Sequence, residues 1–221
     1  AVLDTGGPSV NSAAWNSTNF ISGGVDFVSE DFDPTDPVAV ADTLRTFDDI
    51  SHGTHVATTI ASKNDGVAYN GFPVSALNVR VCSNDNCLYD WWIKGILYAA
   101  GLSNSSGQVA PTTTPIKVIN MSLGGNGTSC NASRQSAINI ATSLGITVVA
   151  AAGNDFSART SYPAACDNVI SVAATDPYGV KAPYSQYNAT VDIAAPGGGV
   201  NETLEGVYAW TNDEKIRGMS G

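Results

Sequence analysis

Only two histidines occur in this 221-residue chain, His52 and His55, within the run His-Gly-Thr-His-Val-Ala. An imidazole accepts and releases a proton near neutral pH, which makes histidine the commonest general base in enzymes. His52 is the better candidate, because it opens a predicted helix beside a glycine and its ring could stand at the edge of a sheet. A single histidine also commonly caps a helix or lies in a core, so this assignment needs partners elsewhere in the chain.

Asp4 is the first candidate partner. It ends a short apolar run in Val-Leu-Asp-Thr-Gly, as a carboxylate at the end of a buried strand would. The tripeptide Asp-Thr-Gly also occurs in aspartic proteases, in which two carboxylates share one proton. The chain contains one copy of it, so that alternative would require a dimer.

Predicted strands and helices alternate along the chain. Strands are expected at residues 1–3, 77–81, 116–121, 146–151, 169–173 and 191–194, and helices at 52–62, 91–100 and 133–144. Asp90 is expected to cap the second helix. This alternation predicts an α/β fold with a doubly wound, mostly parallel sheet and helices on both faces. The acidic segment 23–50, which contains two prolines, is expected to leave the sheet.

Three turns directly follow predicted strands: the one at Asp4, the Ser122-Leu-Gly-Gly turn and the Gly153-Asn154 turn. In open α/β sheets, ligands bind beyond the carboxyl ends of the strands. We therefore expect these turns to meet at one site.

Composition limits the classes of function. The length suits one sizeable domain, so we expect a single domain over residues 1–221. Ten Lys and Arg stand against 20 Asp and Glu, a net charge of −10 that disfavours nucleic-acid binding. No apolar run approaches the ~18 residues of a membrane-spanning helix, so no membrane partner is expected.

The four cysteines favour two disulfides. Cys82 and Cys87 lie close in sequence, and Cys130 with Cys166 is the other expected pair. None shows the paired Cys-x-x-Cys spacing of a zinc site. Two disulfides would indicate an oxidising, extracellular compartment.

In their order along the chain, these motifs resemble those of the subtilisin-like serine proteases, the subtilases. The matching segments are Val-Leu-Asp4-Thr-Gly, His52-Gly-Thr-His-Val-Ala, Val-Ile-Asn-Met-Ser122-Leu-Gly-Gly, Ala-Ala-Gly-Asn154 and Ala195-Pro196-Gly197. The resemblance covers essentially the whole chain, and the cysteines most resemble those of secreted bacterial members. It implies a subtilisin-like fold, protein or peptide substrates and no required cofactor.

The resemblance also implies a role for each residue. His52 would be the general base, Asp4 would hold its other ring nitrogen, and Asn154 would donate to the oxyanion of the tetrahedral intermediate. An extended substrate would pair with the backbone after Ser122, and its side chain before the cut would enter a pocket of small residues. The substrate-binding residues implied are Ser122, Leu123, Gly124, Gly125, Ala151, Ala152 and Gly153.

The family carries its nucleophile in the motif Gly-Thr-Ser-Met-Ala, which is commonly preceded by Ser. This sequence matches only the first residues of that motif. The chain ends in Met219-Ser220-Gly221, so the register implies a reactive serine two residues beyond Gly221. Ser220 is the alternative nucleophile. We therefore expect an interior portion of the catalytic domain, without its N-terminal lead-in and serine-bearing helix, and a companion polypeptide could supply the serine. A non-catalytic relative that binds peptides or a partner is the rival function.

The segment 23–50 leaves two alternatives open, a solvated acidic surface and a structural calcium site. The segment 23–50 is rich in carboxylates, which calcium prefers as ligands. Asp31 and Asp33 are the candidate ligands.

Overall fold

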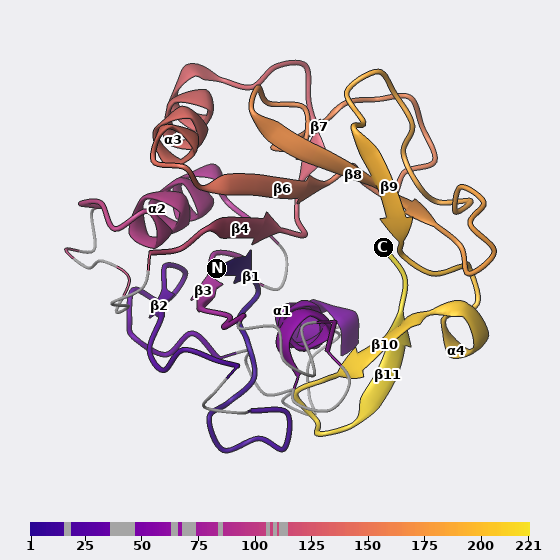
Figure 1. The fold of residues 1–221 in the computed structure, drawn as a ribbon, viewed down its shortest axis with the longest axis horizontal. Helices are drawn as coiled ribbons and strands as arrows, with labels where there is room; N and C mark the ends of the chain where they lie inside the picture. Colours follow the sequence, from indigo (N-terminus) through magenta and orange to yellow (C-terminus); the bar gives the residue numbers. More distant parts are fainter. Residues whose placement is uncertain are drawn as a thin grey trace. The chain divides into compact units, whose positions relative to one another are not determined.

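The computed structural model describes residues 1–15, 19–35, 47–62, 66–67, 74–83, 86–104, 107, 110 and 115–221, with only the backbone of residues 47–50. The chain divides into two compact units. The first contains Ala1–Ile116 and Ala209–Ile216, and the second contains Lys117–Tyr208 and Arg217–Gly221. Each unit has its own parallel strands and helices (Figure 1).

In the first unit, β1 (Val2–Asp4), β2 (Val25–Asp26) and β3 (Asn78–Arg80) are parallel in the order β2-β3-β1. The helices α1 (Phe47–Ala61) and α2 (Tyr89–Ala99) both contact β1. Small side chains on α1 let it approach β1 closely, because Ala57 and Ala61 pack with Val2 in a buried cluster. The helix that carries His52 is thereby packed on the strand that carries Asp4.

In the second unit, four parallel strands lie in the order β4-β6-β8-β9. Their bounds are β4 (Val118–Met121), β6 (Thr147–Ala151), β8 (Val169–Thr175) and β9 (Ile193–Pro196). The helix α3 (Ala132–Ser143) packs on β6 and buries Ala137, Ile138 and Ala141 (Figure 1). The Asn131 side chain caps α3 by accepting a hydrogen bond from the backbone of Arg134 at 3.0 Å.

Smaller elements complete the fold. The two-residue strands β5 (Gly125–Asn126) and β7 (Ser161–Tyr162) pair antiparallel. A short helix, α4 (Glu202–Glu205), precedes β10 (Val207–Trp210) and β11 (Ile216–Met219), which form a separate two-stranded sheet. None of these short elements was expected from the sequence.

The parallel strands and packed helices confirm the α/β prediction, and several boundaries differ from it. The helix α1 begins at Phe47, so His52 lies inside the helix and does not open it. Leu88 is the N-cap of α2, because its backbone is the last extended one, and Asp90 lies in the first turn. There its negative charge still suits the positive end of the helix dipole. The expected capping by Asp90 is therefore wrong.

Two strand predictions also need correction. Residues 25–26, inside the segment expected to leave the sheet, form β2 and pair in parallel with β3. The last parallel strand is β9 (Ile193–Pro196), two residues later than expected. The single domain over residues 1–221 remains a prediction.

Candidate active site

In the first unit, Asp4 and His52 are hydrogen-bonded. His52 Nδ1 lies 2.6 Å from Asp4 Oδ1. The Asp4 side chain is 1% exposed, whereas that of His52 is 40% exposed. A buried carboxylate therefore holds one ring nitrogen of a histidine whose side chain remains accessible to a ligand. An aspartic-protease dyad would need a second carboxylate beside Asp4, and a histidine stands there instead.

The end of β1 fixes the position of Asp4. The Asp4 carbonyl accepts hydrogen bonds from the backbone of Val81 at 2.8 Å and of Cys82 at 3.1 Å. The carboxylate accepts a further bond from the backbone N–H of Thr5 at 2.8 Å. Both the backbone and the side chain of Asp4 are thus held before any substrate binds.

The residue after His52 locks α1 onto the turn that follows Asp4. The backbone N–H of Gly53 donates to Thr5 Oγ1 at 2.8 Å. A Cβ at position 53 would lie 2.2 Å from the carbonyl oxygen of Gly6, far inside van der Waals contact. Only glycine allows this approach, which explains why a glycine occupies the second position of the His-Gly-Thr-His motif.

In the second unit, Asn154 follows β6 and its side chain is exposed. No hydrogen bond from residues 115–221 engages its amide, which leaves the N–H groups able to donate to a ligand. The preceding residue, Gly153, has a φ of 112°, a region that favours glycine. A Cβ at Gly221 would lie 3.4 Å from Asn154 Nδ2, so the last residue of the chain adjoins this amide.

The expected substrate-binding residues divide by burial. Gly124 and Gly125 are exposed, and Gly125 begins the strand β5. Leu123 is 8% exposed and Ala152 is 2% exposed, so these two could meet a substrate mainly through their backbone. Ser122 accepts a hydrogen bond from Asn120 Nδ2 at 3.0 Å. A role of these residues in substrate binding remains a prediction.

Sequence reasoning missed Gln186, which joins the two segments just described. It is 1% exposed, and its backbone N–H donates to the carbonyl of Gly153 at 2.9 Å. Its side-chain Nε2 donates to Asn126 Oδ1 at 3.1 Å. A glutamine in the run Tyr-Ser-Gln-Tyr gives no sequence signal of burial, so only the fold could reveal it.

Ser220 is held against the loop that follows β9. Its hydroxyl donates to the carbonyl of Gly199 at 2.6 Å, and its backbone N–H donates to Glu202 Oε1 at 3.3 Å. The backbone of Gly221 donates to the carbonyl of Gly197 at 3.0 Å. Gly197, the last residue of the Ala195-Pro196-Gly197 motif, and the loop after it therefore anchor Ser220 and Gly221.

Tyr184 reinforces this anchor. Its hydroxyl lies 2.7 Å from the carbonyl oxygen of Gly197 and 2.8 Å from that of Gly198. Burial raises the pKa of Tyr184, a hydrogen bond from the Gly221 backbone lowers it, and the charge of Glu202 raises it. The net direction is upward, which keeps the phenol protonated and able to donate.

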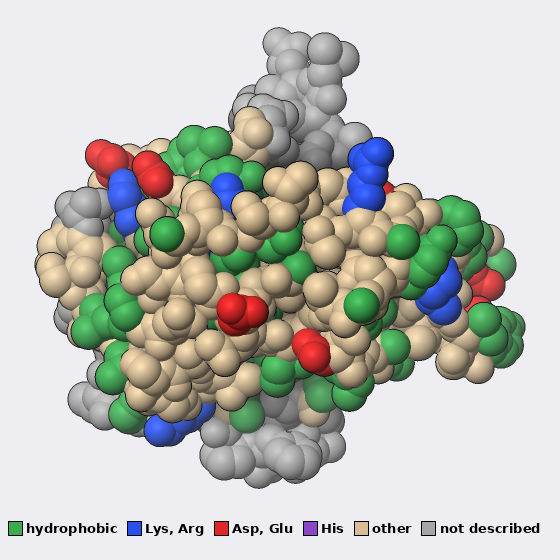
Figure 2. All heavy atoms as spheres, turned by 90° about the horizontal axis from the view of Figure 1, so that it is seen from above, with side chains coloured by type: hydrophobic (Ala, Val, Ile, Leu, Met, Phe, Trp, Pro, Cys, Tyr) green, Lys and Arg blue, Asp and Glu red, His purple; other side chains and the backbone are tan. Residues whose placement is uncertain are grey.

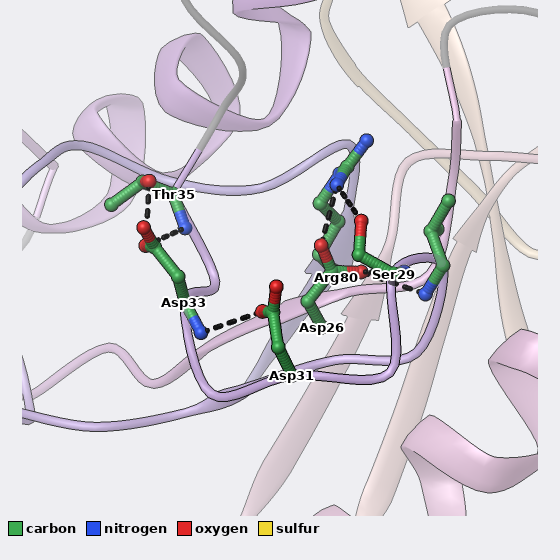
Figure 3. A network of polar contacts seen from close by, with 7 residues as sticks. Asp26, Ser29, Asp31, Asp33, Thr35 and Arg80 are labelled. Carbon is green, nitrogen blue, oxygen red and sulfur yellow. Dashed lines mark hydrogen bonds and ion pairs between the residues drawn. The ribbon is translucent and has the colours of Figure 1, made fainter.

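The candidate calcium ligands take part in local hydrogen bonds instead (Figure 3). Asp31 Oδ1 accepts from the backbone of Asp33 at 2.9 Å, and Asp33 Oδ1 accepts from the backbone and hydroxyl of Thr35. The nearby Asp26 pairs with Arg80 at 2.5 Å. Across the described residues, no group of three or more His, Cys, Asp or Glu side chains is arranged to hold a metal ion.

Both expected disulfides are formed. Cys82 is bonded to Cys87, and Cys130 to Cys166. The first begins at the residue whose N–H donates to Asp4, so it lies beside the Asp4–His52 pair. The second joins the residue before the cap of α3 to the segment after β7.

Comparison with known proteins gives the family of this chain. Residues 1–221 match Peptidase_S8, the subtilase family. The chain belongs to the subtilase family. The fold agrees, because a solved protease from Pseudoalteromonas arctica superposes with a TM-score of 0.80 at 35% identity, over 99% of this chain and 69% of that one.

Curated subtilase relatives are longer than this chain. An extracellular protease of Xanthomonas campestris is 43% identical over 157 residues, which is 69% of this chain and 27% of that protein. Subtilisin Savinase of Lederbergia lenta is 36% identical over 217 residues, which is 96% of this chain and 68% of that protein. The subtilase chain described here thus spans about a quarter of the first relative and two thirds of the second.

The distribution of basic side chains on the described surface agrees with the net negative charge of the sequence. On the face drawn in Figure 2, Lys and Arg side chains stand apart from one another, without a basic patch among the described residues. Of the helices described, none combines the length and apolar character needed to cross a membrane.

Proposed function

We propose that the protein containing this chain is a secreted serine endopeptidase that hydrolyses peptide bonds of proteins. The observation that carries the proposal is the 2.6 Å hydrogen bond between Asp4 and His52. Membership of the subtilase family and the extracellular proteases among its relatives support it. No organic cofactor is needed for this chemistry.

In the proposed reaction, His52 is the general base. Because Asp4 holds Nδ1, the neutral ring carries its proton on Nδ1 and presents Nε2 as a proton acceptor. Nε2 takes the proton of the serine hydroxyl as the serine oxygen attacks the carbonyl carbon of the substrate. The resulting imidazolium is stabilised by the buried carboxylate and returns its proton to the amine when the C–N bond breaks. Water then hydrolyses the acyl-enzyme by the same two proton transfers.

Asn154 would stabilise the oxyanion of the tetrahedral intermediate. Its amide is exposed, and no hydrogen bond within residues 115–221 competes for it. A donor that needs no rearrangement at the moment of reaction is worth about 10²–10³ in turnover. An extended substrate would lie along Gly124 and Gly125, which are exposed beside this turn.

We propose that the nucleophile is a serine two residues beyond Gly221, on the same polypeptide or on a companion. Two contacts support this register over Ser220 itself. The Ser220 hydroxyl is engaged by the carbonyl of Gly199 at 2.6 Å, and Gly221 is the residue that adjoins the Asn154 amide. A calcium ion at Asp31 and Asp33 is not part of the proposal, since local donors occupy their Oδ1 atoms.

The experiment is to label the full protein with a fluorophosphonate and to map the modified peptide by mass spectrometry. We expect the label on the serine two residues after Gly221 and no label in a His52→Ala variant. A label on Ser220 would show that the register is wrong. An intact, folded protein that binds extended peptides without labelling or hydrolysing them would instead support the non-catalytic rival.

A further inference from the structure

Gln186 is a polar side chain that the proposed chemistry does not use and that the fold buries almost completely. It is 1% exposed. A buried amide is costly unless its hydrogen bonds are made. Both protons of its amide nitrogen are used: Nε2 donates to Asn126 Oδ1 at 3.1 Å and to the carbonyl of Arg159 at 2.8 Å.

The other end of the same residue holds the turn that carries Asn154. Its backbone N–H donates to the carbonyl of Gly153 at 2.9 Å. Its Oε1 lies so close to Gly153 that a Cβ there would be 1.6 Å away. The Gly153 φ of 112° is a conformation that few other residues adopt. Gln186 therefore packs against a backbone conformation that depends on glycine at position 153.

Asn126 passes this restraint to the residue on the far side of Asn154. Its Oδ1 accepts from Gln186, and its Nδ2 donates to the carboxylate of Asp155. Asn154 is therefore flanked in sequence by two residues, Gly153 and Asp155, that are both tied to Gln186, directly or through Asn126. Asn126 belongs to β5, which also contains the substrate-binding candidate Gly125.

We propose that Gln186 is a positioning residue that sets the Asn154 amide relative to the strand β5. The inference rests on the proposed function, in which Asn154 meets the oxyanion and β5 borders the substrate. Gln186 touches neither the substrate nor the reacting atoms and acts through Gly153 and Asn126. Because a misplacement of about 1 Å can cost about 10²-fold in rate, loss of the amide should lower turnover strongly.

The test uses Gln186→Met in the full protein, because methionine keeps the length and bulk of the side chain and removes both donors. We expect kcat on a peptide p-nitroanilide to fall about 10–100-fold, with little change in KM. Rates are normalised to active sites titrated with a fluorophosphonate. The matched control is Asn188→Ala: Asn188 donates to the same Arg159 carbonyl at 2.7 Å but has no contact with Gly153 or Asn126 among the contacts described. It should leave kcat unchanged.

A double mutant separates positioning from general stability. If Gln186 acts through Asn154, then Gln186→Met should have almost no further effect on kcat in an Asn154→Ala background. An equal fall in both backgrounds, or no fall in either, would overturn the proposal.

Hydrogen exchange provides a readout that does not depend on activity. The backbone amides of Gln186 and Phe156, which donate to the carbonyls of Gly153 and Tyr184, should exchange faster in Gln186→Met and at the unchanged rate in Asn188→Ala. Unchanged exchange in Gln186→Met would also overturn the positioning role. A wild-type protein that neither labels nor hydrolyses peptides would refute the proposed function, while the exchange result would still decide whether Gln186 holds the turn.

Discussion

Replacing Gly53 with alanine should damage catalysis more than stability. The added Cβ would lie 2.2 Å from the Gly6 carbonyl oxygen, and real Cβ atoms essentially never come within 3.0 Å of a neighbour. The two must separate by 3.0 − 2.2 = 0.8 Å at least. The obstacle is backbone, so no side chain can turn away to relieve the overlap.

A shift of that size would break the contact that aligns His52. The bond from the Gly53 N–H to Thr5 Oγ1 is 2.8 Å long, and a further 0.8 Å would stretch it to about 3.6 Å, which is no longer a hydrogen bond. His52 precedes this residue, so its 2.6 Å bond to Asp4 should be lost or lengthened as well. We expect kcat/KM to fall about 10²-fold or more.

The stability of Gly53→Ala should change much less. Overpacking costs about 1–3 kcal/mol, and the better helix propensity of alanine over glycine returns about 1 kcal/mol. Thermal unfolding of the inhibited protein would measure the balance, and proton NMR of the imidazole Nδ1–H would follow the Asp4–His52 bond.

The control for this substitution is Thr59→Ala on the same helix, whose hydroxyl bonds only the His55 carbonyl among the contacts described. It should keep kcat/KM within about twofold of the wild type. If Gly53→Ala performs as well as Thr59→Ala and its imidazole resonance does not move, then Gly53 does not set the position of His52.

Three further outcomes are expected. Activity should fall in acid as His52 gains a proton, since histidines ordinarily titrate at about pH 6.5. The His52→Ala variant should lose several orders of magnitude in turnover without unfolding. If this variant kept the pH–rate profile of the wild type, His52 would not be the general base. Replacing Cys130 and Cys166 together by alanine opens a loop with a sequence separation of 36 and should lower the free energy of unfolding by about 3–4 kcal/mol, measured by denaturant titration of the inhibited protein. Because the folded-state pKa of Tyr184 is raised above the ordinary 10.0, its stabilising contribution is complete below pH 10 and is lost as pH rises beyond it. The free energy of unfolding of Tyr184→Phe should therefore fall less steeply with pH in alkali than that of the wild type. An unchanged slope of unfolding free energy against pH would count against the raised pKa.

Much of the fold could be predicted from the sequence because its signals are local. The alternation of apolar strands with helices indicated the α/β class, and the strands β4, β6 and β8 lie within two residues of their expected positions. Both cysteine pairings were also expected. The resemblance to the subtilases implied that Asp4 holds a ring nitrogen of His52, and the two are hydrogen-bonded at 2.6 Å in the first unit, while their catalytic roles remain a prediction.

The features that the sequence did not predict correctly depend on contacts distant in sequence or on local backbone geometry. The strand β2 is two residues long and exists because β3 lies beside it, which no periodicity in residues 23–50 could indicate. The cap of α2 moved from Asp90 to Leu88 because the backbone geometry there, and no side-chain hydrogen bond, defines the helix start. Gln186 lies 60 residues from Asn126, so their hydrogen bond appears only once β5 and the loop after β8 are folded together.

The shortness of β5 bears on how such a protein avoids self-association. A sheet edge with unpaired backbone groups can recruit other chains and seed aggregates, and natural proteins limit this hazard by keeping edge strands short. Only Gly125 and Asn126 form β5, and within residues 115–221 the strand pairs with β7 alone. A strand of two residues can form a few backbone hydrogen bonds with an extended peptide. It is too short for a strand of another folded molecule to pair with it and enlarge the sheet. The short length of β5 would thus allow a peptide to bind transiently and would keep concentrated copies of the protein from associating through this edge.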